Sequence, residues 1–408
     1  MEPPDGWQRI LRAFENQRNF CRATSPLMEA LMDEAARGVM PLAAEEDPWP
    51  EYAPFAEALA GAWAERRFLS PVEPSLLVGA TLHRAVLLNM PEAKALAPFY
   101  PSVGGHYAPA DRDGLRSAFQ GFWREASPDT RRFLREGKLQ TNEISRAPAW
   151  LFPAAALHVW FGASLRLLDL GTSAGLNLAA DRLAWRWTTP QGILETEAAG
   201  TVIEQRVEGV LPFPGEGRLV LPAVEARLGI DLRPVNVRDP AQRLLLRSCV
   251  WADETVRLAR LDAAMSAFTA FEGPEAPRLV AGDMADEVAR LPFPQPRSRP
   301  SVVLAFNTVA TTYLPEEAYG RLASNLAARF RALPPGEAGL WVELEGPRMK
   351  DTRGPEDERF LRLTAHTLAP DGTWVHHALG HAEPHPRTWR LNPEGWESLR
   401  AALARSLL

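Results

Sequence analysis

Residues 165–177 read LRLLDLGTSAGLN, and this stretch contains the strongest structural signal in the chain. The apolar run 165–170 predicts a buried strand. Gly171 and Gly175 follow it, and glycine lets the backbone turn tightly and approach a ligand closely. The continuation SAGLNLAADRLAW predicts a helix, whose first N–H groups would favour a carboxylate or a phosphate at the turn. The stretch therefore predicts a strand, a glycine turn and a helix in succession.

Apolar runs alternate with helical patterns from residue 165 to the C-terminus. Such alternation, with strands that are apolar throughout, predicts an α/β fold with a doubly wound, mainly parallel sheet covered by helices on both faces. The last two strand-like runs, 373–384 and 386–393, have no helix between them, and therefore predict an antiparallel C-terminal strand pair. The later predicted strands are 225–232, 278–283, 301–307, 338–346, 373–384 and 386–393, and the predicted helices are 240–268 (one helix or two), 284–291, 315–333 and 395–408.

The chain before this alternation has a different pattern. Its apolar residues recur at helical spacing, and Ser25 is expected to cap a helix that begins at Pro26. We expect residues 1–146 to form a helical cap domain and residues 147–408 to form the α/β domain. Strand-like alternation with many prolines and glycines predicts an inserted hairpin at about 185–222. The length of 408 residues suits two or three domains.

Composition argues against several classes of protein. The chain has 45 basic and 51 acidic residues and no basic block, so binding to nucleic acid by phosphate neutralisation is not expected. Cys21 and Cys249 provide neither a disulfide framework nor a thiolate metal site, which suits a reducing compartment. The uncharged stretch 147–165 contains prolines and leads into a strand, so we expect a buried helix there and no membrane span. No signal peptide is visible, and we expect a cytoplasmic protein.

Polar residues stand at the ends of four predicted parallel strands. They are Asp169, Asp231, Asp283 and Asn307. In doubly wound sheets, ligands bind beyond the carboxyl ends of the strands. We therefore expect these four side chains to gather at one edge of the sheet. The insertion at 185–222 would account for the long spacing between the glycine turn and Asp231.

The pattern acid-x-Gly-x-Ser-x-Gly in residues 169–175 resembles the first motif of the class I S-adenosylmethionine-dependent methyltransferases. Ser173 stands where that family usually has another glycine. The resemblance implies S-adenosylmethionine as the cofactor, with Asp231 accepting hydrogen bonds from the ribose hydroxyls. It also implies that Asp283 and Met284 meet the adenine. The implied cofactor-binding residues are Asp169, Gly171, Thr172, Ser173, Gly175, Asn177, Asp231, Leu232, Asp283 and Met284.

Structural alternatives exist for the same residues. The two glycines could simply pack a strand-to-helix turn, and Asp231 could be a turn or cap carboxylate. A narrower resemblance covers almost the whole chain: it is similar to a bacterial family known only as a domain of unknown function, in the methyltransferase-like fold group and without an assigned reaction. The segments that resemble this family are FYPSVGG (99–105), LQTNE (139–143), the glycine turn with the residues that follow it, DLRPV (231–235), SCVWAD (248–253) and WVELEGP (341–347).

Three residues are candidates for catalysis. Asn307 follows the fourth strand, where members of the superfamily often place a polar residue near the reaction, and could orient a nucleophile. Glu143 could act as a general base if burial raises its pKa. It could equally belong to a helix cap with Thr141 or Asn142. Tyr313 could reach the site or pack against the following helix.

Histidines are concentrated near the C-terminus. Five of the eight lie in 366–385, at positions 366, 376, 377, 381 and 385. The spacing of the last three is too wide on a strand, and too interrupted by glycine and proline for a helix, to make a convincing zinc site. We expect no metal site and interpret the cluster as a polar strand face near the substrate opening.

The leading hypothesis from these observations is an S-adenosylmethionine-dependent methyltransferase that acts on a small molecule or a protein. Methyl transfer would proceed by direct displacement, so the protein would mainly position the reactants. One alternative is a non-catalytic module that binds a partner or senses the cofactor, because Ser173 replaces a glycine and no Asn-Pro-Pro-aromatic signature is present. The other is a nucleotide-dependent enzyme with the same topology. The acceptor and the oligomeric state are not readable from the sequence.

Overall fold

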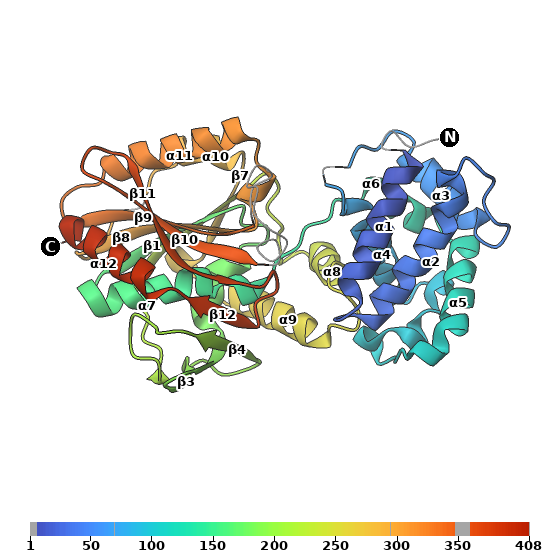
Figure 1. The fold of residues 1–408 in the computed structure, drawn as a ribbon, viewed down its shortest axis with the longest axis horizontal. Coiled ribbons are helices and arrows are strands. Elements are labelled where there is room, and N and C mark those ends of the chain that lie inside the picture. The colour runs from blue at the N-terminus through green and yellow to red at the C-terminus, as the bar shows by residue number, and fades with distance from the viewer. Residues whose placement is uncertain (1–5, 69, 294, 347–359, 408) are drawn as a thin grey trace. The chain divides into compact units, whose positions relative to one another are not determined.

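A computed structural model describes residues 6–68, 70–293, 295–346 and 360–407. It divides into two compact units, shown in Figure 1. The first, here called the helical unit, comprises residues 1–141 and 238–259. The second, the sheet unit, comprises residues 142–237 and 260–408. The predicted cap domain is one continuous segment, whereas the helical unit is assembled from two.

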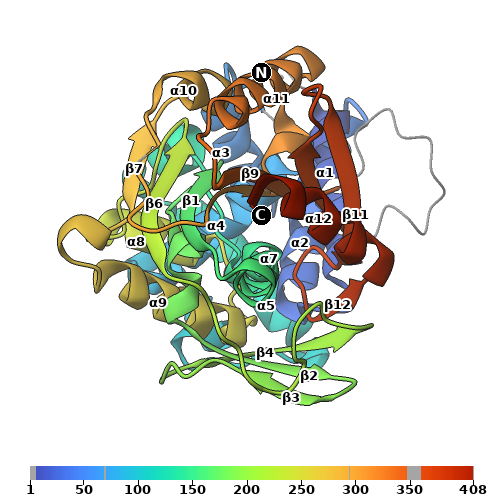
Figure 2. The same cartoon turned by 90° about the vertical axis from the view of Figure 1, so that its left-hand side faces the viewer.

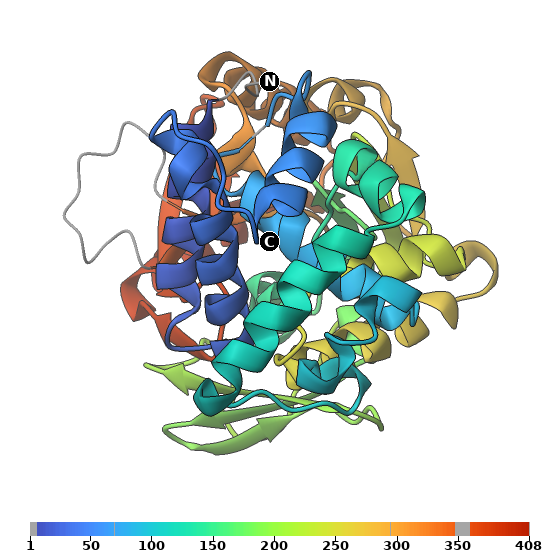
Figure 3. The same ribbon diagram turned by 90° about the vertical axis from the view of Figure 1, so that its right-hand side faces the viewer.

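The helical unit is a set of amphipathic helices around an aromatic core (Figure 3). Ser25 caps α2 by accepting a hydrogen bond of 3.2 Å from the N–H of Met28, and Pro26 occupies the first helical position. Phe55, Phe119 and Trp123 are fully buried and pack edge-on or tilted against one another. Its helices are α1 (Trp7–Cys21), α2 (Pro26–Ala43), α3 (Ala53–Trp63), α4 (Glu73–Leu87), α5 (Arg112–Glu125), α6 (Pro128–Glu136) and α8 (Pro240–Ser248), with short 3-10 turns η1 (Pro91–Ala93), η2 (Ala97–Phe99), η3 (Pro101–Val103) and η4 (Pro109–Asp111).

The second segment of the helical unit, 238–259, is joined to the first by buried polar contacts. The carboxylate of Asp253 accepts hydrogen bonds of 2.5 Å from the Ser25 hydroxyl and 3.0 Å from the N–H of Leu27. The ring of His83 contacts the carbonyl of Val250 at 2.9 Å. The predicted helix at 240–268 is two helices, α8 and α9 (Thr255–Thr269).

The sheet unit contains one mixed, mostly parallel sheet, so the expected α/β class is confirmed (Figure 2). Its strands in spatial order, for the described residues, are β5-β3-β2-β4-β12-β11-β10-β9-β8-β1-β6-β7. The run β7-β6-β1-β8-β9 is parallel and has the 3-2-1-4-5 order of doubly wound sheets. The bounds are β1 (Ser164–Leu170), β2 (Ala184–Thr189), β3 (Gly192–Glu195), β4 (Val202–Glu208), β5 (Gly217–Arg218), β6 (Val224–Asp231), β7 (Arg278–Ala281), β8 (Ser301–Thr308), β9 (Glu337–Glu345), β10 (Leu361–Leu368), β11 (Trp374–Ala382) and β12 (Thr388–Leu391).

Helices cover both faces of this sheet. The pair α10 (Met284–Arg290) and α11 (Glu316–Arg331) packs on one face, above the sheet in Figure 1. The other face is covered by α7 (Pro148–Phe161) and α12 (Pro393–Leu407). β1 and β8 have every residue from Ser164 to Leu170 and from Ser301 to Asn307 buried, which is why they read as continuous apolar runs. The uncharged stretch 147–165 forms α7 and the start of β1, and the described residues contain no helix suited to crossing a membrane.

Two peripheral regions extend the sheet. The insertion contains the antiparallel hairpin β2–β3, and β4 pairs in parallel with both β2 and β12. At the C-terminal end, β11 and β12 are the predicted antiparallel pair. β10 lies between β9 and β11, antiparallel to both, and the sequence pattern did not predict it.

The predicted helix after the glycine turn is instead a short 3-10 segment, η6 (Leu176–Arg182), that leads directly into β2. Side chains from elsewhere in the sheet unit take the carbonyls that an α-helix would use internally. The indole N–H of Trp150 donates to the carbonyl of Asn177 at 2.9 Å, and that of Trp185 donates to Ala180 at 2.7 Å. Because η6 is so short, the helix-dipole argument for an anion at this turn no longer applies.

Candidate functional site

The glycine turn after β1 is built from alternating left-handed residues. Gly171, Ser173 and Gly175 have φ angles of 77°, 53° and 73°. The N–H groups of Gly171 and Thr172 both donate to the carbonyl of Ile230 on β6, at 2.8 and 3.0 Å. A Cβ on Gly171 would lie 2.4 Å from the Cβ of Ala310, and therefore only glycine fits there. The turn is thus held against the ends of β6 and β8.

Ser173 keeps the backbone conformation that a glycine would adopt at its position in the motif. A serine in the left-handed region is disfavoured, so neighbouring contacts must hold it. Its N–H donates to Oδ2 of Asp231 at 2.8 Å, and its carbonyl accepts from the N–H of Val235 at 3.0 Å. These two hydrogen bonds hold Ser173 in the left-handed conformation.

Asp231 connects the end of β6 to the glycine turn. In addition to the Ser173 contact, its Oδ1 accepts a hydrogen bond of 2.8 Å from the N–H of Arg233. Leu232, the next residue, exposes 71% of its surface although it is large and apolar. The structure therefore brings Asp231 into contact with Ser173, although the insertion separates the two in the sequence.

Asp169 lies beneath the turn and is buried. Its Oδ2 accepts a hydrogen bond of 2.8 Å from the hydroxyl of Thr172. Burial raises the pKa of Asp169 to about 7; the bond from Thr172 opposes this shift and the nearby charge of Asp231 adds to it. This buried carboxyl group therefore supports the glycine turn through its hydrogen bond with Thr172.

Asp283 and Met284 stand where β7 meets α10. The carboxylate of Asp283 caps α10 by accepting a hydrogen bond of 2.8 Å from the N–H of Ala285. The preceding Gly282 donates its N–H to the carbonyl of Asp231 at 2.9 Å. The methyl group of Met284 lies 3.9 Å from the position that a Gly171 Cβ would occupy. Met284 thus lies close to the glycine turn, while the Asp283 carboxylate has a structural partner.

Two buried amide oxygens beside the turn have no hydrogen-bond partner in the described part of the chain. They are Oδ1 of Asn142 and Oδ1 of Asn177. The amide nitrogen of Asn142 is 3.5 Å from the carbonyl of Thr172, and Asn177 is the second residue of η6. A buried acceptor without a donor costs about 1–3 kcal/mol. Both oxygens are therefore suited to meet donor groups of a ligand.

Asn307, the predicted nucleophile-orienting residue, is fully buried in a polar network. Its amide nitrogen donates to Oε1 of Glu345 at 2.7 Å and is 3.2 Å from Oε1 of Glu343. Its Oδ1 accepts from the indole of Trp341 at 2.7 Å. The structure thus places Asn307 among structural partners, whereas Tyr313 is 67% exposed on η8 (Thr311–Tyr313).

Glu345 at the end of β9 holds the loop that follows β8. Its Oε1 accepts from the N–H groups of Ala310 and Thr311, at 2.7 and 3.1 Å, and its Oε2 from that of Thr312 at 3.1 Å. Burial raises the pKa of Glu345, and these hydrogen bonds lower it only in part. Val309 in the same loop has φ of 54°, an unfavourable value for a β-branched residue. Nothing in the sequence analysis identified Glu345, although two glutamates in an apolar strand were a visible signal.

His366 on β10 and His376 on β11 join the same network. Oε2 of Glu343 lies 3.0 Å from Nε2 of His366 and accepts a hydrogen bond of 2.9 Å from the Tyr319 hydroxyl. Nδ1 of His366 lies 2.6 Å from Nδ1 of the exposed His376. Burial raises the pKa of Glu343, but His366 and the other donors outweigh it and leave that pKa below its usual value. Within the described residues no cluster of histidine, cysteine or acidic groups could hold a metal ion.

Glu143 and His385 form a pair in the sheet unit. Oε2 of the buried Glu143 lies 3.0 Å from Nδ1 of His385, whose side chain is 34% exposed. Oε1 of Glu143 accepts hydrogen bonds of 3.2 and 2.7 Å from the N–H and the hydroxyl of Ser145. The segment η5 (Ile144–Arg146) packs against η6, directly after the glycine turn. The structure therefore joins a predicted base with a member of the predicted histidine cluster.

The fold and this edge define the chain as a doubly wound α/β protein with a candidate ligand site at the carboxyl ends of its parallel strands. Residues 12–390 match the model of a family described as "Uncharacterized protein conserved in bacteria (DUF2332)", and the chain belongs to that family. The resemblance to a bacterial family of unknown function is thereby confirmed, whereas no match to a methyltransferase family is found. No curated protein and no solved structure matches the chain.

Proposed function

We propose that this protein is an S-adenosylmethionine-dependent methyltransferase whose acceptor is a small molecule or a protein. The main support is the contact between Asp231 and the N–H of Ser173. It places the second-strand carboxylate directly against the glycine turn. Both features are those that the methyltransferase resemblance requires, and they lie at the edge where doubly wound sheets bind ligands.

The residues around the turn suit this cofactor. A carboxylate can accept about four hydrogen bonds, so Asp231 can hold ribose hydroxyls together with its backbone donors. The buried oxygens of Asn142 and Asn177 would accept from the ammonium group of the methionine part. Leu232 and Met284 offer apolar surface for the adenine ring. The bound cofactor would supply a methyl group on a positively charged sulfur, already activated for transfer.

The proposed base is His385, with Glu143 as its positioning residue. A carboxylate only accepts hydrogen bonds, so the contact of Glu143 with Nδ1 requires the proton on Nδ1 and leaves Nε2 as the acceptor in the neutral ring. His385 would take the acceptor's proton at Nε2 while the methyl group bonds to the acceptor atom. Glu143, the residue first considered as a base, then fixes the ring as the carboxylate does in other acid-base pairs.

The position of the proton on the neutral His385 ring tests the pairing of Glu143 with His385 without an assay of methyl transfer. We expect ¹⁵N NMR at alkaline pH to show the proton on Nδ1 in the wild type. Glu143→Ala should remove this preference and populate the Nε2–H form, which usually dominates in a free imidazole. A mixed tautomer in the wild type would contradict the assignment of His385 while leaving cofactor binding untouched.

Calorimetric titration with S-adenosylmethionine and S-adenosylhomocysteine tests the function itself. Asp231→Asn should weaken both affinities by about tenfold or more, since a charged acceptor becomes neutral. Asp371→Asn is a matched control, because Asp371 also accepts from a backbone N–H two residues on, at 2.9 Å to Thr373, but lies in the exposed β10–β11 turn. Equal affinities in the two variants would contradict the proposal.

A second candidate function is a non-catalytic module that binds the same cofactor. It is favoured by the burial of Asn307 and by the capping role of Asp283, which leave two expected site residues with structural partners. This candidate predicts cofactor binding that depends on Asp231 but no methyl transfer to any acceptor pool. Labelled S-adenosylmethionine incubated with bacterial metabolite and protein extracts distinguishes the two, because only the enzyme would transfer the label.

A further inference from the structure

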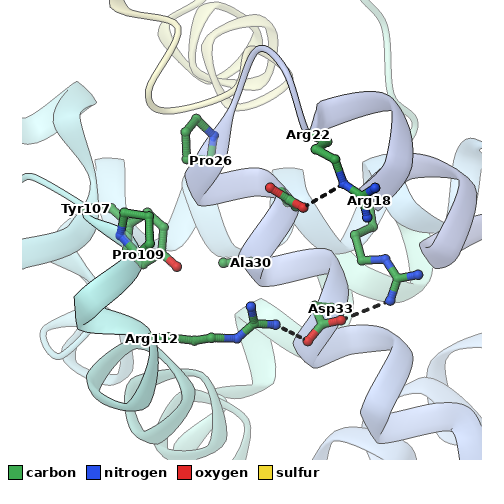
Figure 4. A pocket seen from close by; sticks show the side chains of 9 residues that line it. Arg18, Arg22, Pro26, Ala30, Asp33, Tyr107, Pro109 and Arg112 are labelled. Carbon is green, nitrogen blue, oxygen red and sulfur yellow. Dashed lines mark hydrogen bonds and ion pairs between the residues drawn. The ribbon is translucent and has the colours of Figure 1, made fainter.

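The helical unit contains a cavity of about 320 Å³. All the residues that line it belong to the helical unit, and none belongs to the candidate site at the carboxyl ends of the strands. It lies among α1, α2 and the segment that begins α5, as Figure 4 shows. Three arginines line it: Arg18 and Arg22 come from α1 and its C-terminal end, and Arg112 comes from the start of α5. Pockets that bind small molecules usually begin at about 300 Å³.

Asp33 on α2 contacts three guanidinium groups, of which those of Arg18 and Arg112 line this cavity. Its Oδ1 lies 3.0 Å from Arg18, and its Oδ2 lies 3.0 Å from Arg37 and also contacts Arg112. Burial raises the pKa of Asp33, but the three arginines outweigh it and hold that pKa below its usual value. Asp33 therefore remains ionised near neutral pH and keeps the guanidinium groups in place.

The positive charge around the cavity exceeds the negative charge. Arg22 is balanced by Glu29, at 3.3 Å. Arg18 and Arg112 share the single carboxylate of Asp33, so the three arginines that line the cavity meet two acids and one positive charge is left over.

The arginines around the cavity also have N–H groups that could donate hydrogen bonds to an anion. Nε of Arg18 is buried and has no hydrogen-bond partner among the residues that the structure describes. Each guanidinium has five N–H donors in a planar fork, the geometry that binds phosphate and carboxylate in a bidentate manner. Across the cavity from Arg18 and Arg22, Pro109 and the ring of Tyr107 form an apolar wall, and Pro26 and Ala30 of α2 line the space between (Figure 4).

We propose that this cavity binds a small molecule that carries a phosphate or carboxylate group, with the anionic group on Arg18 and Arg112 and the apolar part against Pro109 and Tyr107. Both Glu29 and Asp33 line the cavity and would repel an anion, but Glu29 is matched by Arg22 alone, whereas Asp33 is shared by Arg18 and Arg112. The anionic group is therefore expected on Arg18 and Arg112, where positive charge is in excess. This inference is independent of S-adenosylmethionine, and it assigns the helical unit a ligand of its own.

NMR of the arginine Nε–H signals of the full-length protein tests the proposal, with inorganic phosphate and, separately, acetate as probes. We expect saturable shifts at Arg18 and Arg112 with millimolar affinity for at least one probe. Phosphate alone as the binder would identify the phosphate class, and acetate alone the carboxylate class. Arg112→Gln should weaken the binding by about fivefold or more while leaving the fold intact, since this side chain is partly exposed.

Arg132→Gln is the control, because Arg132 is also an exposed arginine of the helical unit, paired with Asp129 outside the cavity. It should leave both affinities unchanged. Absence of saturation by either probe would overturn the proposal. So would equal weakening in Arg112→Gln and Arg132→Gln, since that result would mean general attraction of anions to surface charge.

Discussion

The turn after β1 and the loop after β8 lie at the same edge of the sheet and are held in different ways. The first is fixed by the backbone: glycine-like φ angles, two N–H bonds to Ile230 and a single carboxylate, Asp231. The loop after β8 is fixed by Glu345, which accepts from three backbone N–H groups and from Asn307. The turn leaves buried acceptors beside it without donors, whereas the loop uses its donors internally. The comparison assigns ligand binding to the turn and support to the loop.

The largest expected effect is a difference in stability between a variant of the loop after β8 and a variant of the glycine turn. Glu345→Leu leaves three backbone N–H groups without their acceptor and removes the shortest contact of the Asn307 amide, and should lower the free energy of unfolding by about 4 kcal/mol. Asp231→Asn should lower it by about 1 kcal/mol or less, because its contacts are near the surface. Urea unfolding of both variants measures the difference. Equal losses would remove the distinction between loop and turn.

A second comparison concerns the packing of the two regions against each other. Gly171→Ala combines a φ of 77° with a clash against Ala310, and should cost about 3 kcal/mol. Gly162→Ala is the matched control, since Gly162 has φ of 61° and a Cβ there would meet nothing within 4 Å. Its cost should be about 1 kcal/mol, from backbone strain alone. Thermal unfolding measures both losses of stability. Equal losses at the two positions would show that the loop after β8 does not pack tightly against the turn.

The smallest expected effect is a dependence on pH. The folded-state pKa of Asp169 is raised from 3.8 to about 7, so ionisation of this group opposes folding. Its destabilising contribution is absent below about pH 4, grows as the pH rises and is complete above pH 7. Asp169→Asn should therefore gain about 2 kcal/mol of stability relative to the wild type between pH 5 and pH 8. Paired urea titrations at the two pH values measure this, and a constant difference would contradict the buried, partly protonated state.

The sequence predicted the parts of this edge that depend on short-range pattern. The strand, the left-handed glycines and the acid at the end of β6 follow from local residue types, and the α/β alternation placed them at one edge. The η6 segment could not be predicted as it is, because indoles of Trp150 and Trp185 decide it from other elements. The local preference of residues 176–182 for an α-helix is therefore overridden by hydrogen bonds from other parts of the sheet unit.

The polar network behind Asn307 was not predictable for a related reason. Its partners meet only through strand register: Asn307 lies opposite Glu343 on β9, and His366 lies opposite Trp341 and His376. Register between strands is set by the whole sheet, including β10, which the pattern did not reveal. The Glu143–His385 pair likewise joins residues at opposite ends of the sheet unit's sequence, and each was noticed alone.

A crystal structure of the complex with S-adenosylhomocysteine is the most direct test of the proposed function. The proposal predicts both ribose hydroxyls within hydrogen-bonding distance of the Asp231 carboxylate, and the ammonium group of the amino-acid part beside Asn142 and Asn177. A ligand bound elsewhere in the sheet unit, or an unoccupied turn in crystals soaked with saturating ligand, would contradict it.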